Sequence, residues 1–238
     1  MQIHLILGPT GVGKTAHATR LAYSQNEPVI VLDRIQAYPE LSVGSGRPGA
    51  SEYAGTERLY LAERRVAEGD FLVRDALDAL HTLLRRNGRV IVEGGSISLL
   101  HALFATSWFQ RASVTYDVLS LPDLAYYQER VTRRIGAMLD EGMVDELQHA
   151  WSQGAQARAF VQTVIGYDVL LDVCCEQMLS PARLAEVLRS DVGLRSRTVR
   201  RIFQRHLRYA IHQQSMIDHH LSPAVLAPVE LAQRSVAM

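Results

Sequence analysis

The sequence is poor in cysteine and in lysine. Its 238 residues include two cysteines, the adjacent Cys174 and Cys175. Neighbouring cysteines do not easily share an unstrained disulfide, and no CxxC or Cys/His spacing typical of a metal site is present. The pattern indicates reduced thiols, as in proteins of the cytoplasm.

An excess of charge of one sign and long hydrophobic runs are also absent. Lys+Arg and Asp+Glu both number 25, so no overall field attracts the chain to nucleic acid or to a membrane. The apolar segment before Gly8 is too short for a signal sequence, and no apolar run approaches membrane-spanning length. We therefore expect a soluble, cytoplasmic protein. Hydrophobic residues form 47% of the chain, enough for a buried core.

Lys14 is the only lysine, and every other fixed cation is an arginine. A GC-rich genome explains the general shortage, because it disfavours lysine codons. One position has nevertheless kept the compact ammonium group, which indicates a chemical role for Lys14.

Short apolar runs alternate with helical patterns over residues 1–121. The pattern predicts strands at 3–7, 29–32, 89–92 and 113–121, and helices at 15–22, 70–86 and 98–104. Glycine, proline and serine crowd residues 39–51, which we expect to form a loop. Strands that alternate with helices pair in parallel through crossover connections. The predicted fold class is therefore α/β, with a parallel sheet and flanking helices.

Beyond Pro122 the pattern is helical. It predicts long helices at 123–152 and 181–218, the second opened by Ser180 as the cap and Pro181 in the first turn. The stretch from Leu221 onward is expected to be loosely ordered. The predicted division is an α/β domain at 1–121 and a smaller helical domain at 122–238 that completes the active site.

Residues 8–15, GPTGVGKT, fit the P-loop pattern G-x-x-x-x-G-K-[ST] between a predicted strand and a predicted helix. Glycines let a phosphate approach backbone N–H groups, and the following helix directs its positive dipole end at the same anion. Lys14 adds a point charge, and the Thr15 hydroxyl can hold Mg²⁺. The candidate phosphate ligands are Gly8, Gly11, Gly13, Lys14 and Thr15. Such loops serve kinases, GTPases, ATPases and sulfate or prenyl transferases alike, so the motif does not identify the reaction.

Acidic residues lie where two of the predicted strands end. Ligands of a doubly wound sheet bind beyond the carboxyl ends of its strands, so Asp33 and Glu93 belong near the P-loop. Asp33 is a candidate general base, and the alternative is a structural acid that caps a helix or pairs with Arg34. Glu93 either holds a metal ion or a water, or closes a turn.

Several sequence blocks, in this order, resemble the bacterial adenylate dimethylallyltransferases, the cytokinin-forming isopentenyltransferases. The blocks are GPTGVGKT (8–15), LDRIQAYPELSVGSGRP (32–48), GTERLYL (55–61) and EGGSISLL (93–100). Weaker blocks are found at Arg134, Gly166-Tyr167 and RYAIHQ (208–213). The tRNA dimethylallyltransferases are similar more loosely, through GPT-x-x-GKT and a following D-x-x-Q.

The resemblance implies a P-loop NTPase-like fold in which the loop holds dimethylallyl diphosphate rather than a nucleotide. It implies transfer of the dimethylallyl group to the N6 amine of AMP, with Asp33 as the base, Thr10 orienting the leaving group and Arg134 clamping the diphosphate. Lys14 completes the expected catalytic set, with Mg²⁺ as the cofactor. The implied nucleotide ligands are Asp33, Arg34, Ser45, Gly46 and Arg47. His206 and Tyr209 are candidates for the prenyl pocket.

Arginines recur on one face of the last predicted helix. Arg197, Arg201, Arg205 and Arg208 form a stripe at helical spacing, with no acidic residue between Val192 and Ile217. The stripe is open to three interpretations: a phosphate-facing wall of the active site, an RNA-binding face, or a solvated helix paired with acids elsewhere.

Three other functions remain open. A tRNA adenosine dimethylallyltransferase needs extra surface to grip an anticodon stem, and about 120 residues after the sheet with no net charge offer little of it. We therefore expect small-molecule substrates and no nucleic-acid partner. A small P-loop kinase would release ADP from ATP, and a catalytically inactive P-loop switch would bind nucleotide without forming any product.

Overall fold

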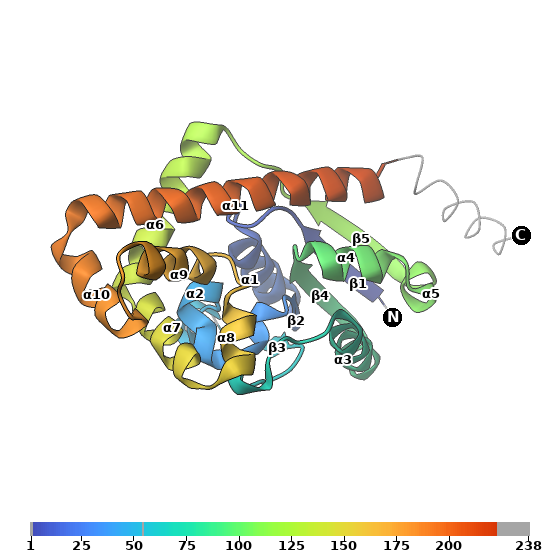
Figure 1. Ribbon diagram of the computed structural model, residues 1–238. Coiled ribbons are helices and arrows are strands. Elements are labelled where there is room, and N and C mark those ends of the chain that lie inside the picture. Colours follow the sequence, from blue (N-terminus) through green and yellow to red (C-terminus); the bar gives the residue numbers. More distant parts are fainter. Residues whose placement is uncertain (1, 54, 223–238) are drawn as a thin grey trace, which may run out of the picture.

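The computed structural model describes residues 2–53 and 55–222 and has a parallel α/β fold (Figure 1). Five strands form one sheet in the order β3-β2-β4-β1-β5, and every neighbouring pair is parallel. The strands are β1 (Gln2–Leu7), β2 (Val29–Leu32), β3 (Arg58–Tyr60), β4 (Arg89–Gly94) and β5 (Ser113–Val118). The predicted α/β class with a parallel sheet and flanking helices is confirmed.

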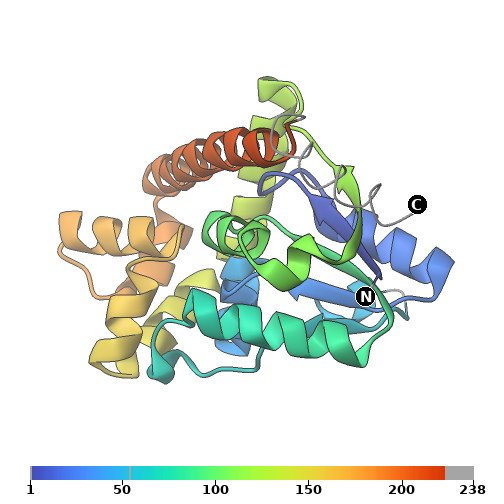
Figure 2. The same ribbon diagram turned by 90° about the vertical axis from the view of Figure 1, so that its right-hand side faces the viewer.

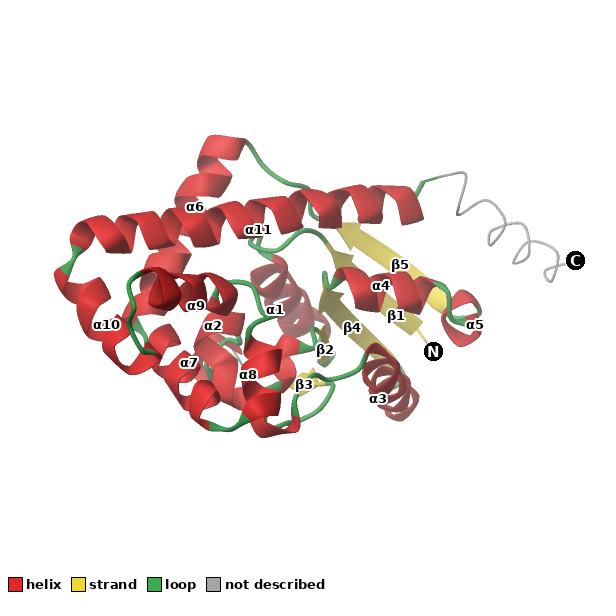
Figure 3. Cartoon of the chain, in the orientation of Figure 1, coloured by secondary structure: helices red, strands yellow, loops and turns green. Residues whose placement is uncertain are grey.

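Side-chain alternation along the strands divides the core of the sheet into two layers. Ile6 and Ile91 pack with Ala18 and Ala22 of α1 (Lys14–Gln25) on one face. Leu5 and other strand residues of the opposite face pack against α3 (Val73–Arg86) and α4 (Ile97–Phe104). Helices therefore cover both faces of the sheet (Figure 2, Figure 3). A four-residue helix, α5 (Ser107–Gln110), precedes β5.

No strand follows β5 among the described residues, and β5 ends at Val118, earlier than predicted. The helical part consists of α6 (Leu124–Asp140), α7 (Met143–Ser152), α8 (Ala155–Val161), α9 (Tyr167–Glu176), α10 (Pro181–Ser190) and α11 (Val192–His220). As predicted, Ser180 occupies the N-cap of α10 and Pro181 lies in its first turn. The sequence pattern predicted neither α8 nor α9.

Each of the two long helices that we predicted is interrupted once. The segment 123–152 divides at Gly142, whose φ of +110° lies in the region that favours glycine. The segment 181–218 divides at Asp191, whose side chain accepts a hydrogen bond from the backbone N–H of Leu194 at 2.8 Å and caps α11. Apolar residues continue across both breaks, so hydrophobic periodicity alone did not reveal them.

The segment 39–51, predicted as a loop, contains short helical turns. They include η2 (Pro39–Leu41), the single turn α2 (Ser42–Ser45) and the start of η3 (Ala50–Tyr53). Two further 3₁₀ turns are η1 (Ile35–Ala37) and η4 (Val66–Glu68). Strand β3 was also not predicted, because a three-residue edge strand shows no usable alternation.

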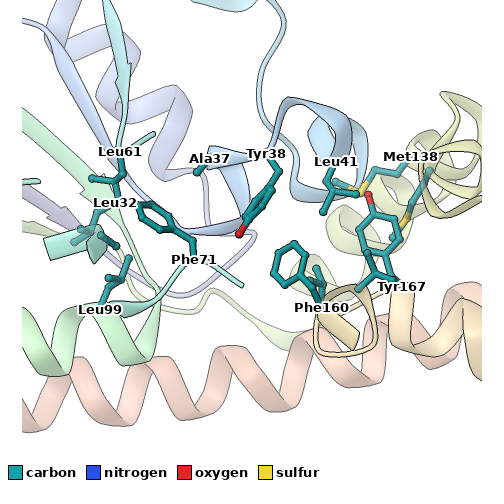
Figure 4. Packing of buried hydrophobic residues seen from close by; sticks show 14 of the residues in the cluster. Leu32, Ala37, Tyr38, Leu41, Leu61, Phe71, Leu99, Met138, Phe160 and Tyr167 are labelled. Carbon is teal, nitrogen blue, oxygen red and sulfur yellow. The ribbon is translucent and has the colours of Figure 1, made fainter. Parts of the chain in front are cut away.

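One hydrophobic cluster extends from the sheet into the helical part (Figure 4). The rings of Tyr38 and Phe160 lie with their centroids 4.5 Å apart. Figure 4 shows Leu41, Met138 and Tyr167 gathered at the helical end of this cluster. A shared core thus joins the two predicted parts, and the division into domains at 1–121 and 122–238 stays a prediction.

Helix α11 is 29 residues long, about 44 Å. In Figure 1 it is the long orange-red helix, and it contacts α4 as well as α6, α9 and α10. It therefore connects a helix that covers the sheet with the helical part. The predicted loose order from Leu221 onward concerns residues 223–238, which lie outside the described residues. No helix in the described ranges combines the length and apolarity needed to cross a membrane.

Candidate functional site

The P-loop connects the end of β1 to the first residue of α1 through backbone conformations that suit glycine. The φ angles of Gly8, Gly11 and Gly13 are +150°, +79° and +104°. A Cβ at Gly8 would collide with the carbonyl oxygen of Leu119. These glycines let the loop curve around the free N–H groups at the start of α1, which is the geometry that binds anions.

Lys14 lies across the inside of this loop. Its Nζ donates hydrogen bonds to the carbonyl oxygens of Gly8 and Pro9, both at 2.8 Å. Burial lowers the pKa of Lys14 to about 8, although the charges of Glu93 and Asp33 oppose the shift. The ammonium is therefore poorly solvated and has no hydrogen-bonded carboxylate among the described residues, which favours binding of an anionic ligand.

Thr15 is hydrogen-bonded to the acid of β4. Its hydroxyl donates to Oε2 of Glu93 at 3.1 Å, while Oε1 of the same carboxylate forms an ion pair with Arg58 of β3. Glu93 is 3% exposed and lies within the strand, so it does not close a turn. Because the Thr15 hydroxyl directs its hydrogen toward Glu93 in this hydrogen bond, the lone pairs of its oxygen remain available to a cation. Arg58 was not predicted because β3 itself was not predicted.

Asp33 follows β2 directly and uses its two carboxylate oxygens differently. Oδ1 accepts the backbone N–H groups of Ile35 at 2.8 Å and Gln36 at 3.4 Å, which caps η1. Oδ2 has no hydrogen-bond partner among the residues that the structure describes. Burial raises the pKa of Asp33, and the two backbone hydrogen bonds and the charge of Lys14 oppose this rise. The capping interpretation and the base interpretation are therefore compatible.

A pocket opens beside the P-loop. Four segments that are far apart in sequence line it: the P-loop, α2, α6 and α11. From the predicted set, Thr10, Gly11, Ser45, Arg134 and His206 line the pocket. The aliphatic side chains of Val131, Ile135 and Met138 contribute an apolar wall. The pocket thus combines a phosphate-binding loop with an apolar surface.

Two arginines of α6 lie against this site. Burial and the neighbouring charge of Arg130 lower the pKa of Arg134, and a Cβ at Gly46 would collide with the Arg134 guanidinium. Arg130 lies against Gly13, where a Cβ would come within 2.9 Å of its Nη2. Within the described ranges neither guanidinium has a carboxylate or a carbonyl partner. Two neighbouring cations are stabilised when an anion lies between them. Arg130 was not predicted, although its place one turn before Arg134 was a usable signal.

Both backbone polar groups of Thr10 are held by the helical part. The Thr10 N–H donates to Oε1 of Gln213 at 2.8 Å, and the hydroxyl of Tyr127 donates to the Thr10 carbonyl at 3.0 Å. The side-chain amide of Gln213 also donates to the carbonyl oxygen of Gly95. Neither Tyr127 nor Gln213 was predicted. The block RYAIHQ, which ends at Gln213, was the available signal for the second.

Two of the predicted nucleotide ligands have other partners. Arg34 pairs with Asp70 at 3.0 Å and not with Asp33. Arg47 pairs with Glu63 at 2.6 Å, and its guanidinium lies 3.6 Å from the centroid of the Tyr60 ring. Both guanidiniums therefore bind protein groups, and neither lines the pocket.

The two candidates for a prenyl pocket differ in position. His206 lines the pocket, and burial together with the charge of Arg134 lowers its pKa to about 4, so its imidazole is neutral near pH 7. Tyr209 does not line the pocket, and its hydroxyl accepts the backbone N–H of Ile97 at 3.3 Å. Burial raises the pKa of Tyr209.

Two of the four arginines in the predicted stripe of α11 are paired with acids of α9. Arg201 binds Glu176 at 2.7 Å and Asp172 at 3.4 Å, and Arg205 binds Asp168 at 2.5 Å. For these two arginines the interpretation as a helix paired with acids elsewhere is the one that the structure supports. Their role is to join α11 to α9.

Comparisons with known proteins identify relatives over most of the chain. The family model described as isopentenyl transferase matches residues 1–224. An adenylate dimethylallyltransferase of Ralstonia nicotianae is 32% identical over 224 residues, which cover 90% of this chain and 92% of that protein. One of Allorhizobium ampelinum is 37% identical, over 81% of this chain and 85% of that protein.

Solved structures share the fold at low sequence identity. A tRNA isopentenylpyrophosphate transferase of Bacillus halodurans superposes with a TM-score of 0.70 at 18% identity and covers 91% of this chain and 86% of its own. One of Staphylococcus epidermidis has a TM-score of 0.65 at 15% identity, with 99% of both chains covered. Identities this low bear on the fold alone.

Proposed function

The chain belongs to the isopentenyl transferase family and is a prenyltransferase, and from this premise we propose that it transfers the dimethylallyl group of dimethylallyl diphosphate to the N6 amine of AMP. The products would be a cytokinin nucleotide and pyrophosphate. The observation that supports this proposal best is the pocket that joins a phosphate-binding loop to an apolar wall beside Arg134. The relatives that match this chain over most of their length are named adenylate dimethylallyltransferases, which supports AMP as the acceptor.

The diphosphate of the donor would bind the P-loop, with its negative charge facing Lys14, Arg130 and Arg134. Cleavage of the bond between the allylic carbon and oxygen leaves negative charge on pyrophosphate, which donors already in place stabilise without reorganisation. Thr10 would orient this leaving group from a backbone that Gln213 and Tyr127 hold in place. The aliphatic wall and the neutral His206 suit the apolar prenyl chain and keep water away from its cationic carbon.

We also propose Mg²⁺ as the cofactor, bound at the Thr15 hydroxyl. The residues fit this ion. The Thr15 hydroxyl donates a hydrogen bond to Glu93, which leaves the lone pairs of its oxygen for the cation. The searched part of the chain has no cluster of three acids, histidines or cysteines suited to a metal, so diphosphate oxygens and water would supply the other ligands. The ion would neutralise charge on the departing pyrophosphate.

Asp33 would act on the acceptor. The N6 amine is a weak nucleophile because its lone pair is delocalised into the purine, so proton removal must accompany formation of the carbon–nitrogen bond. The unpartnered Oδ2 of Asp33 would accept this proton. Ser45 and Gly46 would contact the nucleotide at the pocket wall. Arg34 and Arg47 remain proposed nucleotide ligands on the condition that the nucleotide displaces their carboxylate partners.

The proposal is tested by offering dimethylallyl diphosphate with AMP, ADP, ATP and unmodified tRNA together and identifying the products by mass spectrometry. We expect N6-prenylated AMP together with pyrophosphate. Prenylated tRNA with unmodified AMP would show the tRNA transferase activity instead. Release of ADP without any prenylated product would indicate a kinase, and nucleotide binding without product would indicate an inactive switch. The expected cytoplasmic location stays a prediction.

We expect a bell-shaped pH dependence of activity. At low pH the kcat/KM for AMP should fall, because protonated Asp33 no longer accepts a proton, and its raised pKa places this limb above the range of ordinary aspartates. At high pH the kcat/KM for the donor should fall through about 8, where Lys14 loses its charge. Initial rates at constant ionic strength measure both limbs. A donor kcat/KM that stays flat above this pH would contradict the role of Lys14.

A further inference from the structure

The α2 segment forms one wall of the pocket, yet its own sequence gives it little helical stability. It is a single turn of four residues, SVGS, with a glycine in its third position. One turn of helix is unfavourable in isolation because nucleation fixes several residues for a single hydrogen bond. Its conformation must therefore be imposed by contacts with other parts of the chain.

Glu146 of α7 supplies these contacts. Its Oε1 accepts the backbone N–H of Val43 at 2.7 Å, and its Oε2 accepts that of Gly44 at 2.9 Å. The Ser42 hydroxyl also donates to Oε1 at 3.3 Å. Donors at the start of a helix have no partner within the helix, and a carboxylate placed there satisfies them and favours the helix dipole. A residue about one hundred positions away thus caps α2.

Tyr167 holds the carboxylate from the other side. Its hydroxyl donates to Oε2 of Glu146 at 2.5 Å. Burial and the charge of Glu146 raise the pKa of Tyr167 well above its ordinary value, so the hydroxyl stays protonated and keeps donating. Gly44 lies directly against the Tyr167 ring, where any Cβ would collide with the hydroxyl. The Tyr167 ring itself is fully buried beside Leu41 (Figure 4).

The far end of α2 forms the wall of the pocket. Gly44 and Ser45 line it, and Gly46 takes a φ of +64° against the Arg134 guanidinium. Among the described residues the hydrogen bonds of the Glu146 carboxylate go to α2 and to Tyr167 and none goes to the P-loop, so its influence on the pocket passes through α2. This inference rests on the proposed function, in which the nucleotide lies beside Ser45 and Gly46.

We propose that Glu146 and Tyr167 are positioning residues that fix the acceptor side of the pocket by holding α2 in place. They determine how well the nucleotide binds, and they affect the donor diphosphate less, because only the contact of Gly46 with Arg134 links α2 to the donor side. Neither residue touches a substrate.

The test is Glu146→Gln, which keeps the size of the side chain but sets an amide NH₂ against a backbone N–H. We expect the KM for AMP to rise about tenfold, as for the loss of a hydrogen bond to a charged group. The KM for dimethylallyl diphosphate and the affinity for pyrophosphate alone should change much less than the KM for AMP. Tyr167→Phe removes one of the contacts to Glu146 and should raise the KM for AMP by about threefold. This milder variant also serves if Glu146→Gln does not fold.

Leu80→Ala is the matched control for lost stability. Leu80 is buried in α3, away from the pocket lining, so this variant should lower the Tm without changing either KM. An unchanged KM for AMP in both Glu146→Gln and Tyr167→Phe would overturn the proposal. An equal rise of both KM values, or a rise that Leu80→Ala reproduces at the same loss of Tm, would also overturn it. If the wild-type protein prenylates another acceptor, the proposed AMP activity is wrong, and the same measurements are made with that acceptor.

Discussion

Asp33→Asn is expected to lower kcat by about 10²–10⁴-fold, the usual contribution of a general base. The substitution removes the base but retains an oxygen that can accept the backbone N–H groups of Ile35 and Gln36. The turn after β2 should therefore keep its shape, and the loss should fall on the chemical step. Steady-state product formation gives kcat, and calorimetry with pyrophosphate gives the affinity of the P-loop, which should stay at the wild-type value.

Two further measurements separate a base from a structural cap. The acidic limb of the pH profile should disappear in Asp33→Asn, because asparagine does not titrate. Asp33→Ala removes the cap as well and should add a loss of Tm to a similar loss of kcat. Turnover that remains near the wild-type value in Asp33→Asn would exclude Asp33 as the base, and the residue would then be a cap alone.

Lys14→Met should weaken donor binding and the chemical step together, with a loss of about 10²–10³-fold in the kcat/KM for dimethylallyl diphosphate. Methionine preserves most of the side-chain length and removes the charge that stabilises the departing pyrophosphate. Burial already disfavours the charged form of Lys14, as its pKa of about 8 indicates. Removal of this charge should therefore cost little folding stability, and we expect no large loss of Tm.

Arg89→Ala is the matched control for net charge. It also removes one cation, but from an exposed side chain on β4 that pairs with Glu27. Its kcat/KM should match that of the wild-type protein. Near-normal activity of Lys14→Met would contradict the assignment of the P-loop to the donor diphosphate.

Local sequence was enough to predict those parts of the fold that local forces determine. The strand at 29–32 has the predicted bounds because four consecutive apolar residues precede Asp33. The P-loop connects a strand to a helix as predicted because its glycines permit positive φ angles. The three-residue β3 and the two helix breaks, at Gly142 and Asp191, were not predicted. None of these three features changes the hydrophobic pattern around it.

Contacts between distant segments account for what the sequence could not reveal. The turn α2 is imposed by Glu146, which lies 103 positions beyond Val43. Gln213 holds Thr10 from 203 positions away, and the partners of Arg34 and Arg47 are acids of other segments. The sequence predicted several of the residues that gather at the pocket, but not the side chains that position them. The catalytic roles of the predicted residues stay predictions until the variants are measured.

The scarcity of lysine has a consequence for covalent chemistry on this protein. Lys14 is the only side-chain amine in the chain, and its lowered pKa leaves a larger unprotonated fraction at neutral pH than an ordinary lysine has. Acylation of a lysine side chain, whether by a laboratory reagent or by a metabolite, can therefore occur only inside the phosphate-binding loop. A single acetyl group there would remove the cation that faces the diphosphate, while the surface arginines would not react.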